Sequence, residues 1–242
     1  MRAILTGHSR GLGAGVCEAL LQADIAVLAL SRRGNDALAA RYGDRLRQIP
    51  IDLADTRRLA ALTESEDWTA FLGGEESRIL VNNAGALAPM APVGRQRARA
   101  IDRAINVNVS AALILSDAFV AATERSTDRR LLHVSSGAAR SAYAGWSVYC
   151  ASKAALDHHA RAIQLDRIPR LRLASVAPGV IDTDMQASIR SSTAEDFPAI
   201  DRFQALHRDG HLQSPTECGR RLVEHLLSPS FGDAVTADMR EL

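Results

Sequence analysis

Tyr149 and Lys153 have the residue types and spacing of a proton-transfer pair. They lie four residues apart in the segment Trp146–Lys153, so on a helix both side chains would occupy one face. An ammonium group beside a phenol favours the phenolate and lowers the pKa of the tyrosine from about 10 toward neutral pH. Such a tyrosine serves as a general acid or base. A surface tyrosine lying along a lysine stem has the same spacing, so the rest of the chain must discriminate between the two.

A glycine-rich turn, Thr6-Gly7-His8-Ser9-Arg10-Gly11-Leu12-Gly13, separates the first apolar segment from a helical one. Glycines permit a tight turn and the close approach of a pyrophosphate. The N-terminus of the following helix then offers free N–H groups to the phosphates. The spacing G-x-x-x-G-x-G differs from the commoner G-x-G-x-x-G. We interpret the turn as a dinucleotide site, and a purely structural turn is the alternative.

Ser31, Arg32 and Arg33 end the second apolar segment. NAD-binding sheets usually carry an acidic residue here for the ribose 2′-hydroxyl, whereas an arginine accommodates a 2′-phosphate. Arg10 would add a third positive charge, and guanidinium–phosphate pairs are bidentate and strong. The sequence therefore predicts NADP(H) in preference to NAD(H). The alternative is that Arg32 and Arg33 merely begin a solvated loop.

Two further strand ends carry polar or small residues. Asp52 and Leu53 close the third apolar segment, and the carboxylate either accepts from the adenine amino group or caps the helix that begins near Asp55. The fourth segment ends in Asn82-Asn83-Ala84-Gly85. Small residues and paired amides suit a backbone that lies close to the cofactor.

Short apolar segments alternate with longer helical ones along the chain. The strand candidates are Ala3–Leu5, Ile25–Leu30, Leu46–Ile51, Ile79–Val81, Leu131–Val134, Leu171–Val176 and Ala234–Ala237. The helical candidates are residues 12–22, 35–42, 55–62, 95–123, 147–167 and 216–227. This alternation predicts a single α/β domain over residues 1–242, a doubly wound parallel sheet with helices on both faces. Ligands of such sheets bind beyond the carboxyl ends of the strands, where the motifs above gather.

The segment 182–213 is polar and has no clean period. A segment of this length inside a compact domain is usually a functional lid or a small helical insertion. We interpret it as a substrate-covering loop, and ordinary surface elaboration is the alternative.

Composition excludes several classes of function. Lys and Arg total 29 against 28 Asp and Glu, which argues against general affinity for nucleic acid or membrane surfaces. Cys17, Cys150 and Cys218 form no CxxC pair, and the histidines show no metal spacing, so we expect free thiols in a reducing cytosol and no metal. The chain opens on an apolar segment and a glycine turn, without a signal-peptide pattern, and we expect a cytoplasmic protein.

Taken together, the motifs resemble those of the short-chain dehydrogenase/reductases. Thr6–Gly13, Asn82–Gly85, Ser136, Tyr149-x-x-x-Lys153 and Pro178-Gly179 occur in that family's order and spacing over nearly the whole chain. The resemblance implies a single-domain Rossmann fold with a doubly wound, mostly parallel seven-stranded sheet. Within the family, the segments 145–153 and 177–186 look like sepiapterin reductases and bacterial diketone (benzil-type) reductases.

The resemblance also implies a catalytic set. Tyr149 would donate the proton to the substrate carbonyl, and Lys153 would lower its pKa and hydrogen-bond the nicotinamide ribose. Ser136 would hold the carbonyl oxygen, with Ser135 as the less favoured choice. Asn108 would hold a water in the proton relay, with Asn106 as its rival.

The implied cofactor contacts come from every strand end. Those expected near the adenosine and phosphates are Gly7, Ser9, Arg10, Gly11, Leu12, Gly13, Ser31, Arg32, Arg33, Asp52 and Leu53. Those expected near the nicotinamide half are Asn83, Ala84, Gly85, Tyr149, Lys153, Pro178, Gly179, Ile181 and Thr183. Thr183 also suits the N-cap of a following helix, and both roles are compatible.

Substrate contacts are expected from Ser136, Trp146 and Asp238. Sepiapterin reductases anchor a pterin through an acid near the C-terminus, where Asp238 stands; a solvated carboxylate is the alternative. Trp146 either lines the substrate pocket or packs under the lid.

The expected activity is NADP(H)-dependent reduction of a ketone or diketone to an alcohol. A 3-oxoacyl-thioester reductase or another alcohol dehydrogenase of the family is the first alternative. A non-catalytic NADP(H)-binding regulatory protein is the second, and an intact Tyr149–Lys153 pair argues against it. Members of the family usually associate through the long helices near 95–123 and 147–167, so we expect a homodimer or homotetramer.

Overall fold

The computed structural model describes residues 1–242 and contains one seven-stranded sheet. Its strands are β1 (Arg2–Thr6), β2 (Ala26–Ser31), β3 (Leu46–Pro50), β4 (Arg78–Asn82), β5 (Arg129–Val134), β6 (Leu171–Ala177) and β7 (Thr236–Asp238). They are hydrogen-bonded in the order β3-β2-β1-β4-β5-β6-β7, and every neighbouring pair is parallel. All seven predicted strands and the doubly wound arrangement are confirmed. The order reverses between β1 and β4, which is where such sheets bind nucleotides.

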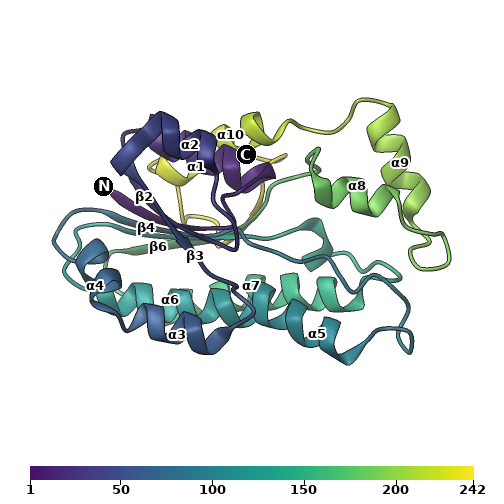
Figure 1. The fold of residues 1–242 in the computed structure, drawn as a ribbon, viewed down its shortest axis with the longest axis horizontal. Coiled ribbons are helices and arrows are strands. Elements are labelled where there is room, and N and C mark those ends of the chain that lie inside the picture. Colours follow the sequence, from purple (N-terminus) through teal and green to yellow (C-terminus); the bar gives the residue numbers. More distant parts are fainter.

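Helices cover both faces of the sheet (Figure 1). One face carries α1 (Gly11–Gln22), α2 (Asp36–Tyr42) and α10 (Pro215–Leu227). The other carries α3 (Thr56–Thr63), α4 (Glu66–Leu72), α5 (Ala98–Ile105), α6 (Ala111–Ala122) and α7 (Ser147–Leu165). Single turns of 3₁₀ helix lie at Gly43–Arg45 and Gly137–Ala139. Helix α4 was not predicted, although Ser65 caps it by accepting from the Trp68 N–H.

Alternate residues of the strands pack into two separate hydrophobic cores, one on each face of the sheet. Ala3, Leu5 and Val27 join the α1 and α10 side, whereas Ile4 and Leu28 join the α6 side. Successive side chains of a strand point to opposite faces, so a strand buried on both sides reads as continuously apolar. This is why the apolar segments located the strands so closely.

Helices α1 and α10 approach closely because glycines face each other. A Cβ on Gly15 would lie 2.3 Å from the Pro215 carbonyl oxygen, and one on Gly219 would lie 2.4 Å from the Gly15 carbonyl carbon. Neither contact is sterically possible. The packing of α10 against α1 thereby fixes the orientation of α1, whose N-terminus faces the nucleotide edge of the sheet.

Residues 98–122 form one long helix in which α5 and α6 are joined by a π-helical turn, Asn106–Ser110. By length and composition this helix could cross a membrane. Its apolar side chains include Leu115 and Phe119, which are fully buried in the core between α6 and the sheet. They therefore account for the apolar character as core packing.

Half of the segment 182–213 is helical, so it is not the irregular loop that the sequence suggested. It contains α8 (Asp184–Arg190) and α9 (Ile200–Arg208), which extend beyond the end of the sheet (Figure 1). Each helix is short. The buried apolar residues that anchor the segment are divided between the two helices and their linker: Ile189, Phe197, Ile200 and Phe203. Neither helix alone therefore shows the repeat of apolar residues every three to four positions from which a helix is predicted.

Candidate active site

The glycine turn is pinned against the end of β4. Asn83 Nδ2 donates to the carbonyls of Thr6 (2.8 Å) and Gly7 (3.2 Å), and the Thr6 hydroxyl accepts from the backbone N–H of Asn83 (3.0 Å) and Ala84 (2.9 Å). A Cβ on Gly13 would lie 2.0 Å from the Gly7 carbonyl oxygen. The turn therefore requires glycine at position 13 in order to close on itself.

No side chain caps the N-terminus of α1. Arg10 is the N-cap residue in an extended conformation, and its side chain makes no capping hydrogen bond. The first N–H groups of a helix have no partners within the helix, and together with the dipole they favour an anion. This end of α1 therefore has the properties of a phosphate site.

Ser31, at the position where NAD-binding sheets carry an acid, is held by a buried histidine. His8 Nδ1 lies 3.1 Å from the Ser31 hydroxyl, and His8 Nε2 lies 2.5 Å from Gln48 Oε1. Burial lowers the pKa of His8 and the hydrogen bond to Gln48 opposes this, so the ring is neutral near pH 7. Arg32 and Arg33 follow on the exposed surface. Sequence reasoning missed His8 and Gln48 because their partners are far apart in the chain.

Two predicted phosphate or adenine contacts have protein partners. Arg10 pairs with Asp184 at the start of α8 (2.5 Å), and both side chains are mostly exposed, so the pair contributes little to stability. Asp52 receives two hydrogen bonds from Arg103, of 3.0 and 3.1 Å. Burial raises the pKa of Asp52, but the bonds from Arg103 and a backbone N–H outweigh this and lower it. Asp55, not Asp52, caps α3, so the capping alternative for Asp52 is wrong.

Tyr149, Lys153 and Ser136 lie together at the ends of α7 and β5. Lys153 Nζ is 5.8 Å from the centroid of the Tyr149 ring and donates to the Val134 carbonyl (2.8 Å). Ser136 lies close enough to Tyr149 to lower its pKa, and its hydroxyl accepts from the Ala138 N–H (3.1 Å). Ser135 instead is buried and donates to Asp157 (2.6 Å). Of the two serines, the structure thus places Ser136 beside the tyrosine.

Burial dominates the ionisation of both groups. It raises the pKa of Tyr149, and the neighbouring Ser136 side chain only partly offsets this. The expectation that the pKa of Tyr149 is lowered is therefore wrong for this structure, because desolvation of the phenolate outweighs the other influences. Burial also lowers the pKa of Lys153 to about 8. At pH 7 the site thus holds a neutral phenol beside an ammonium, the protonation state that a proton donor needs.

Asn108 lies in the π-helical turn and faces the same centre. Its Oδ1 accepts from the Ala86 N–H (2.6 Å), while its Nδ2 donates to the Ala86 carbonyl (2.8 Å) and to Ser152 (3.0 Å). A Cβ on Gly85 would lie 3.6 Å from Lys153 Nζ and 3.8 Å from Asn108 Oδ1. Gly85, Asn108 and Lys153 therefore border one small space. Asn106, the alternative to Asn108, lies two residues earlier in the turn. Its Oδ1 accepts a hydrogen bond from the Ser110 hydroxyl.

The end of β6 meets the glycine turn. A Cβ on Gly11 would lie 3.2 Å from the Thr183 methyl group, so these two residues are neighbours. Thr183 caps α8 by accepting from the Gln186 N–H. Gly179, after Pro178, adopts a φ of +88°, and Ile181 forms a bridge with Gln213 at the end of the 182–213 segment.

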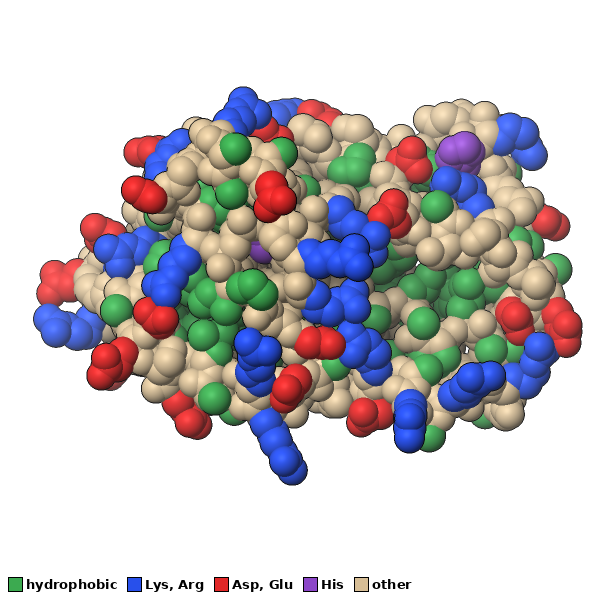
Figure 2. Space-filling model, viewed as in Figure 1, with side chains coloured by type: hydrophobic (Ala, Val, Ile, Leu, Met, Phe, Trp, Pro, Cys, Tyr) green, Lys and Arg blue, Asp and Glu red, His purple; other side chains and the backbone are tan.

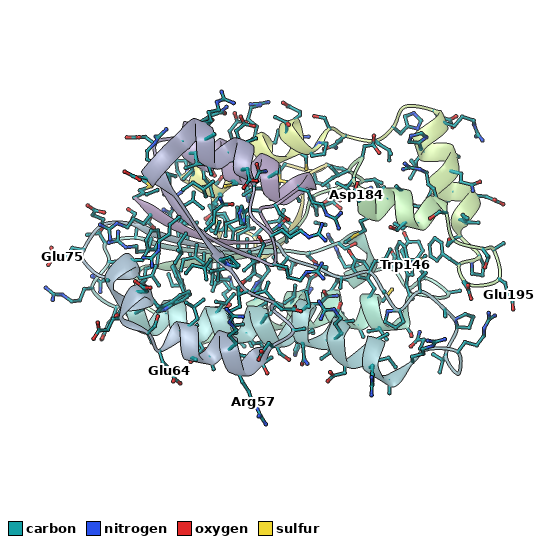
Figure 3. All side chains as sticks on the ribbon, in the orientation of Figure 1. Arg57, Glu64, Glu75, Trp146, Asp184 and Glu195 are labelled. Atoms are coloured by element: carbon teal, nitrogen blue, oxygen red, sulfur yellow. The ribbon has the colours of Figure 1, made fainter.

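An aromatic cluster connects this segment to Tyr149. Trp146 stacks on Phe197 with ring centroids 4.4 Å apart and an interplanar angle of 15°, and meets the Tyr149 ring edge-on at 5.5 Å. Figure 3 shows Trp146 below α8 and α9 and Asp184 at the near end of α8. Trp146 is buried, so it packs under the 182–213 segment. On the surface, Figure 2 shows a hollow with hydrophobic walls beneath this segment, beside a column of basic side chains.

Asp238 ends β7 and is buried with arginine partners. Its two oxygens accept from Arg240 at 2.8 and 2.6 Å, and Arg140 lies 3.7 Å away. These hydrogen bonds from Arg240 lower the pKa of Asp238. The alternative of a solvated carboxylate is wrong, because the side chain is only 4% exposed. A substrate contact by Asp238 would compete with Arg240.

The residues present fit a nicotinamide dinucleotide. The uncapped start of α1 suits the pyrophosphate, the small residues Ala84 and Gly85 leave space beside Lys153, and no carboxylate stands at Ser31. These features come from three different strand ends on one edge of the sheet, as the fold requires.

The comparisons with known proteins agree. A family model described as short chain dehydrogenase matches residues 1–194. An (S)-benzoin-forming benzil reductase from Bacillus cereus is 32% identical over 97% of this chain and 98% of its own. Sepiapterin reductase from Bos taurus is 28% identical over 97% of this chain and 92% of its own.

A crystal structure of a short-chain dehydrogenase/reductase from Burkholderia vietnamiensis is 46% identical. It covers 100% of this chain and 97% of its own, with a TM-score of 0.72. The resemblance inferred from the motifs is confirmed. The chain belongs to the short-chain dehydrogenase/reductase family, a family of nicotinamide-dependent oxidoreductases that interconvert alcohol and carbonyl groups.

Proposed function

We propose that this protein is an NADP(H)-dependent reductase of ketones or diketones. The observation that carries the proposal is the buried pair of Tyr149 and Lys153, whose Nζ lies 5.8 Å from the ring centroid, with Ser136 beside the phenol. The similarity to a benzil reductase over nearly the full length of both chains supports a diketone as substrate. The similarity to sepiapterin reductase supports the same reaction type.

The proposed chemistry assigns one task to each side chain. A bound nicotinamide would supply the hydride to the carbonyl carbon. Ser136 and Tyr149 donate hydrogen bonds to the carbonyl oxygen, whose negative charge grows as the reaction proceeds, so they act mainly in the transition state. Tyr149 then gives up its proton. Lys153 stabilises the phenolate that remains, and a water held near Asn108 returns the proton.

The preference for NADP(H) is supported by charge at the end of β2. Ser31 brings no carboxylate there, and Arg32 and Arg33 are exposed and available to a 2′-phosphate. Arg10 leaves its exposed partner Asp184 at little cost, because surface ion pairs contribute only about 0–1 kcal/mol.

The hydrophobic hollow favours an apolar substrate. Trp146 and Phe197 belong to a cluster that Tyr143, Leu87 and Met90 extend toward the surface. Aromatic and aliphatic walls with few polar groups are typical of small-molecule pockets. We propose that α8 and α9 act as the lid of this pocket. A charged 3-oxoacyl thioester remains the alternative substrate, with the exposed arginines as its expected contacts.

The test is a panel of carbonyl compounds assayed with NADPH and with NADH. The panel contains benzil, aliphatic diketones, pterins, acetoacetyl thioesters and simple ketones. We expect the highest kcat/KM for an aromatic diketone with NADPH. A clear preference for the thioester would support the alternative, and no turnover of any carbonyl would refute the reductase. Sedimentation of the same sample tests the expected homodimer or homotetramer.

A further inference from the structure

Asp157 carries a buried carboxylate that has no role in the proposed reaction steps. It lies on α7 four residues after Lys153 and eight after Tyr149, so all three share one face of the helix. Its side chain is turned into the protein, where the residue is 4% exposed. A carboxylate is seldom found this deep unless its charge has a partner or a task.

Two hydroxyl groups from neighbouring strands fix this carboxylate. Ser135, just after β5, donates to Asp157 Oδ1 at 2.6 Å, and Ser175 on β6 donates to the same oxygen at 2.7 Å. Hydrogen bonds donated to a carboxylate favour its ionised form. Both partners are neutral, so the negative charge of Asp157 is held in place without being cancelled by an adjacent cation.

Lys153 is a buried cation one helical turn from this charge. Its Nζ is buried and donates to a neutral acceptor, the Val134 carbonyl. Burial lowers the pKa of Lys153 to about 8, and the charge of Asp157 opposes that shift. In a buried site of low dielectric, a charge one helical turn away still acts strongly.

The other groups that face Lys153 supply no negative charge at neutral pH. On α7, Tyr149 is neutral, because burial raises its pKa. On β5, burial lowers the pKa of His133 to about 3, so this histidine is neutral as well. Asn108 and Gly85, on the opposite side, carry no charge. Asp157 is therefore the anion that acts on Lys153.

We propose that Asp157 is a positioning residue, whose carboxylate, fixed by Ser135 and Ser175, keeps Lys153 in its ammonium form at the working pH. This inference rests on the proposed function only in giving the ammonium a catalytic purpose. The electrostatic part can be measured in the protein without substrate.

The chain makes that measurement direct, because Lys153 is its only lysine. Protein grown with ¹³C-labelled lysine gives a single ε-CH₂ signal, whose chemical shift follows the ionisation of this one side chain. We expect Asp157→Asn to lower the midpoint of this titration by roughly one pH unit. Asp166→Asn, which alters an exposed carboxylate just beyond the end of α7, is the matched control and should leave the midpoint unchanged.

The same substitution should move the alkaline limb of the kcat/KM profile to lower pH by the same amount. An unchanged lysine midpoint in Asp157→Asn, with only a lower Tm, would show that Asp157 merely ties α7 to the sheet and would overturn the proposal. If Asp157→Asn does not fold, Ser175→Ala removes one donor and should lower the midpoint in the same direction; no change there overturns it equally. A wild-type protein that reduces no carbonyl would defeat the proposed function without altering the lysine titration.

Discussion

The substitution Phe197→Ala tests whether the α8–α9 segment is a separately docked lid. Phe197 is fully buried, stacks on Trp146 at 4.4 Å and lies 5.4 Å from the Phe203 ring. These rings belong to a hydrophobic cluster distinct from the two cores that flank the sheet. A segment anchored by its own cluster can open without the sheet unfolding.

The expected magnitude follows from the apolar side chains that the α8–α9 segment buries. Ile189, Phe197, Ile200 and Phe203 are its buried apolar anchors, each contributing roughly 1.5–3 kcal/mol. Truncating a buried phenylalanine to alanine costs about 3–5 kcal/mol. If this loss falls on docking alone, the free energy of opening drops by at least ~3 kcal/mol, which is on the order of 10²-fold in the opening equilibrium.

Hydrogen exchange measured by mass spectrometry is the assay. Amides of α8 and α9 should exchange on the order of 10²-fold faster in Phe197→Ala, while those of the sheet keep their rates. Phe119→Ala is the matched control, because Phe119 is equally buried but lies in the core between α6 and the sheet. We expect the control to lower Tm by on the order of 10 °C, and Phe197→Ala to change it little. An equal loss of Tm in both variants, without selective exchange in the lid, would refute the reasoning.

Four further predictions concern the chemistry and the ionisation of the site. Tyr149→Phe should lose at least on the order of 10² in kcat with NADPH affinity retained, because it removes only the proton donor; undiminished turnover would contradict the mechanism. Replacing Arg32 and Arg33 by alanine should raise the KM for NADPH far more than that for NADH, and steady-state kinetics showing equal effects would exclude their role at the 2′-phosphate. Reduction should decline as pH rises through about 8, where Lys153 loses its proton. Because the unfolded lysine keeps its proton up to its ordinary pKa of 10.5, the contribution of Lys153 to the free energy of unfolding should rise with pH over this window, and denaturant titrations at several pH values check the sign.

Much of the active-site edge could be read from local sequence. Gly7–Gly13, Asn83–Gly85 and Ser136 all come soon after strands that are buried on both faces and therefore continuously apolar. The Tyr149–Lys153 pair lies farther along, in the first turns of α7. In a parallel sheet the carboxyl ends of such strands meet at one edge. Knowing that each motif follows a strand was thus enough to predict that the motifs meet.

The ionisation of the site could not be read in that way. The spacing of Tyr149 and Lys153 indicates a lowered pKa for the tyrosine, whereas burial raises it. Burial is a property of everything packed around a residue, including the Trp146 ring and the apolar side chains of the 182–213 segment. The spacing of two residues in the sequence therefore does not predict how deeply they are buried.

The sequence by itself determined the fold, the family and the identity of the residues at the strand ends, because those depend on local periodicity and on motifs of a few residues. Only the tertiary structure decided which charges face one another. Asp184 reaches Arg10, Arg103 reaches Asp52, and Ser135 and Ser175 converge on a single oxygen of Asp157. These partners are 18 to 174 positions apart in the chain. Such contacts depend on how whole helices pack on the sheet, and only the folded chain specifies that packing.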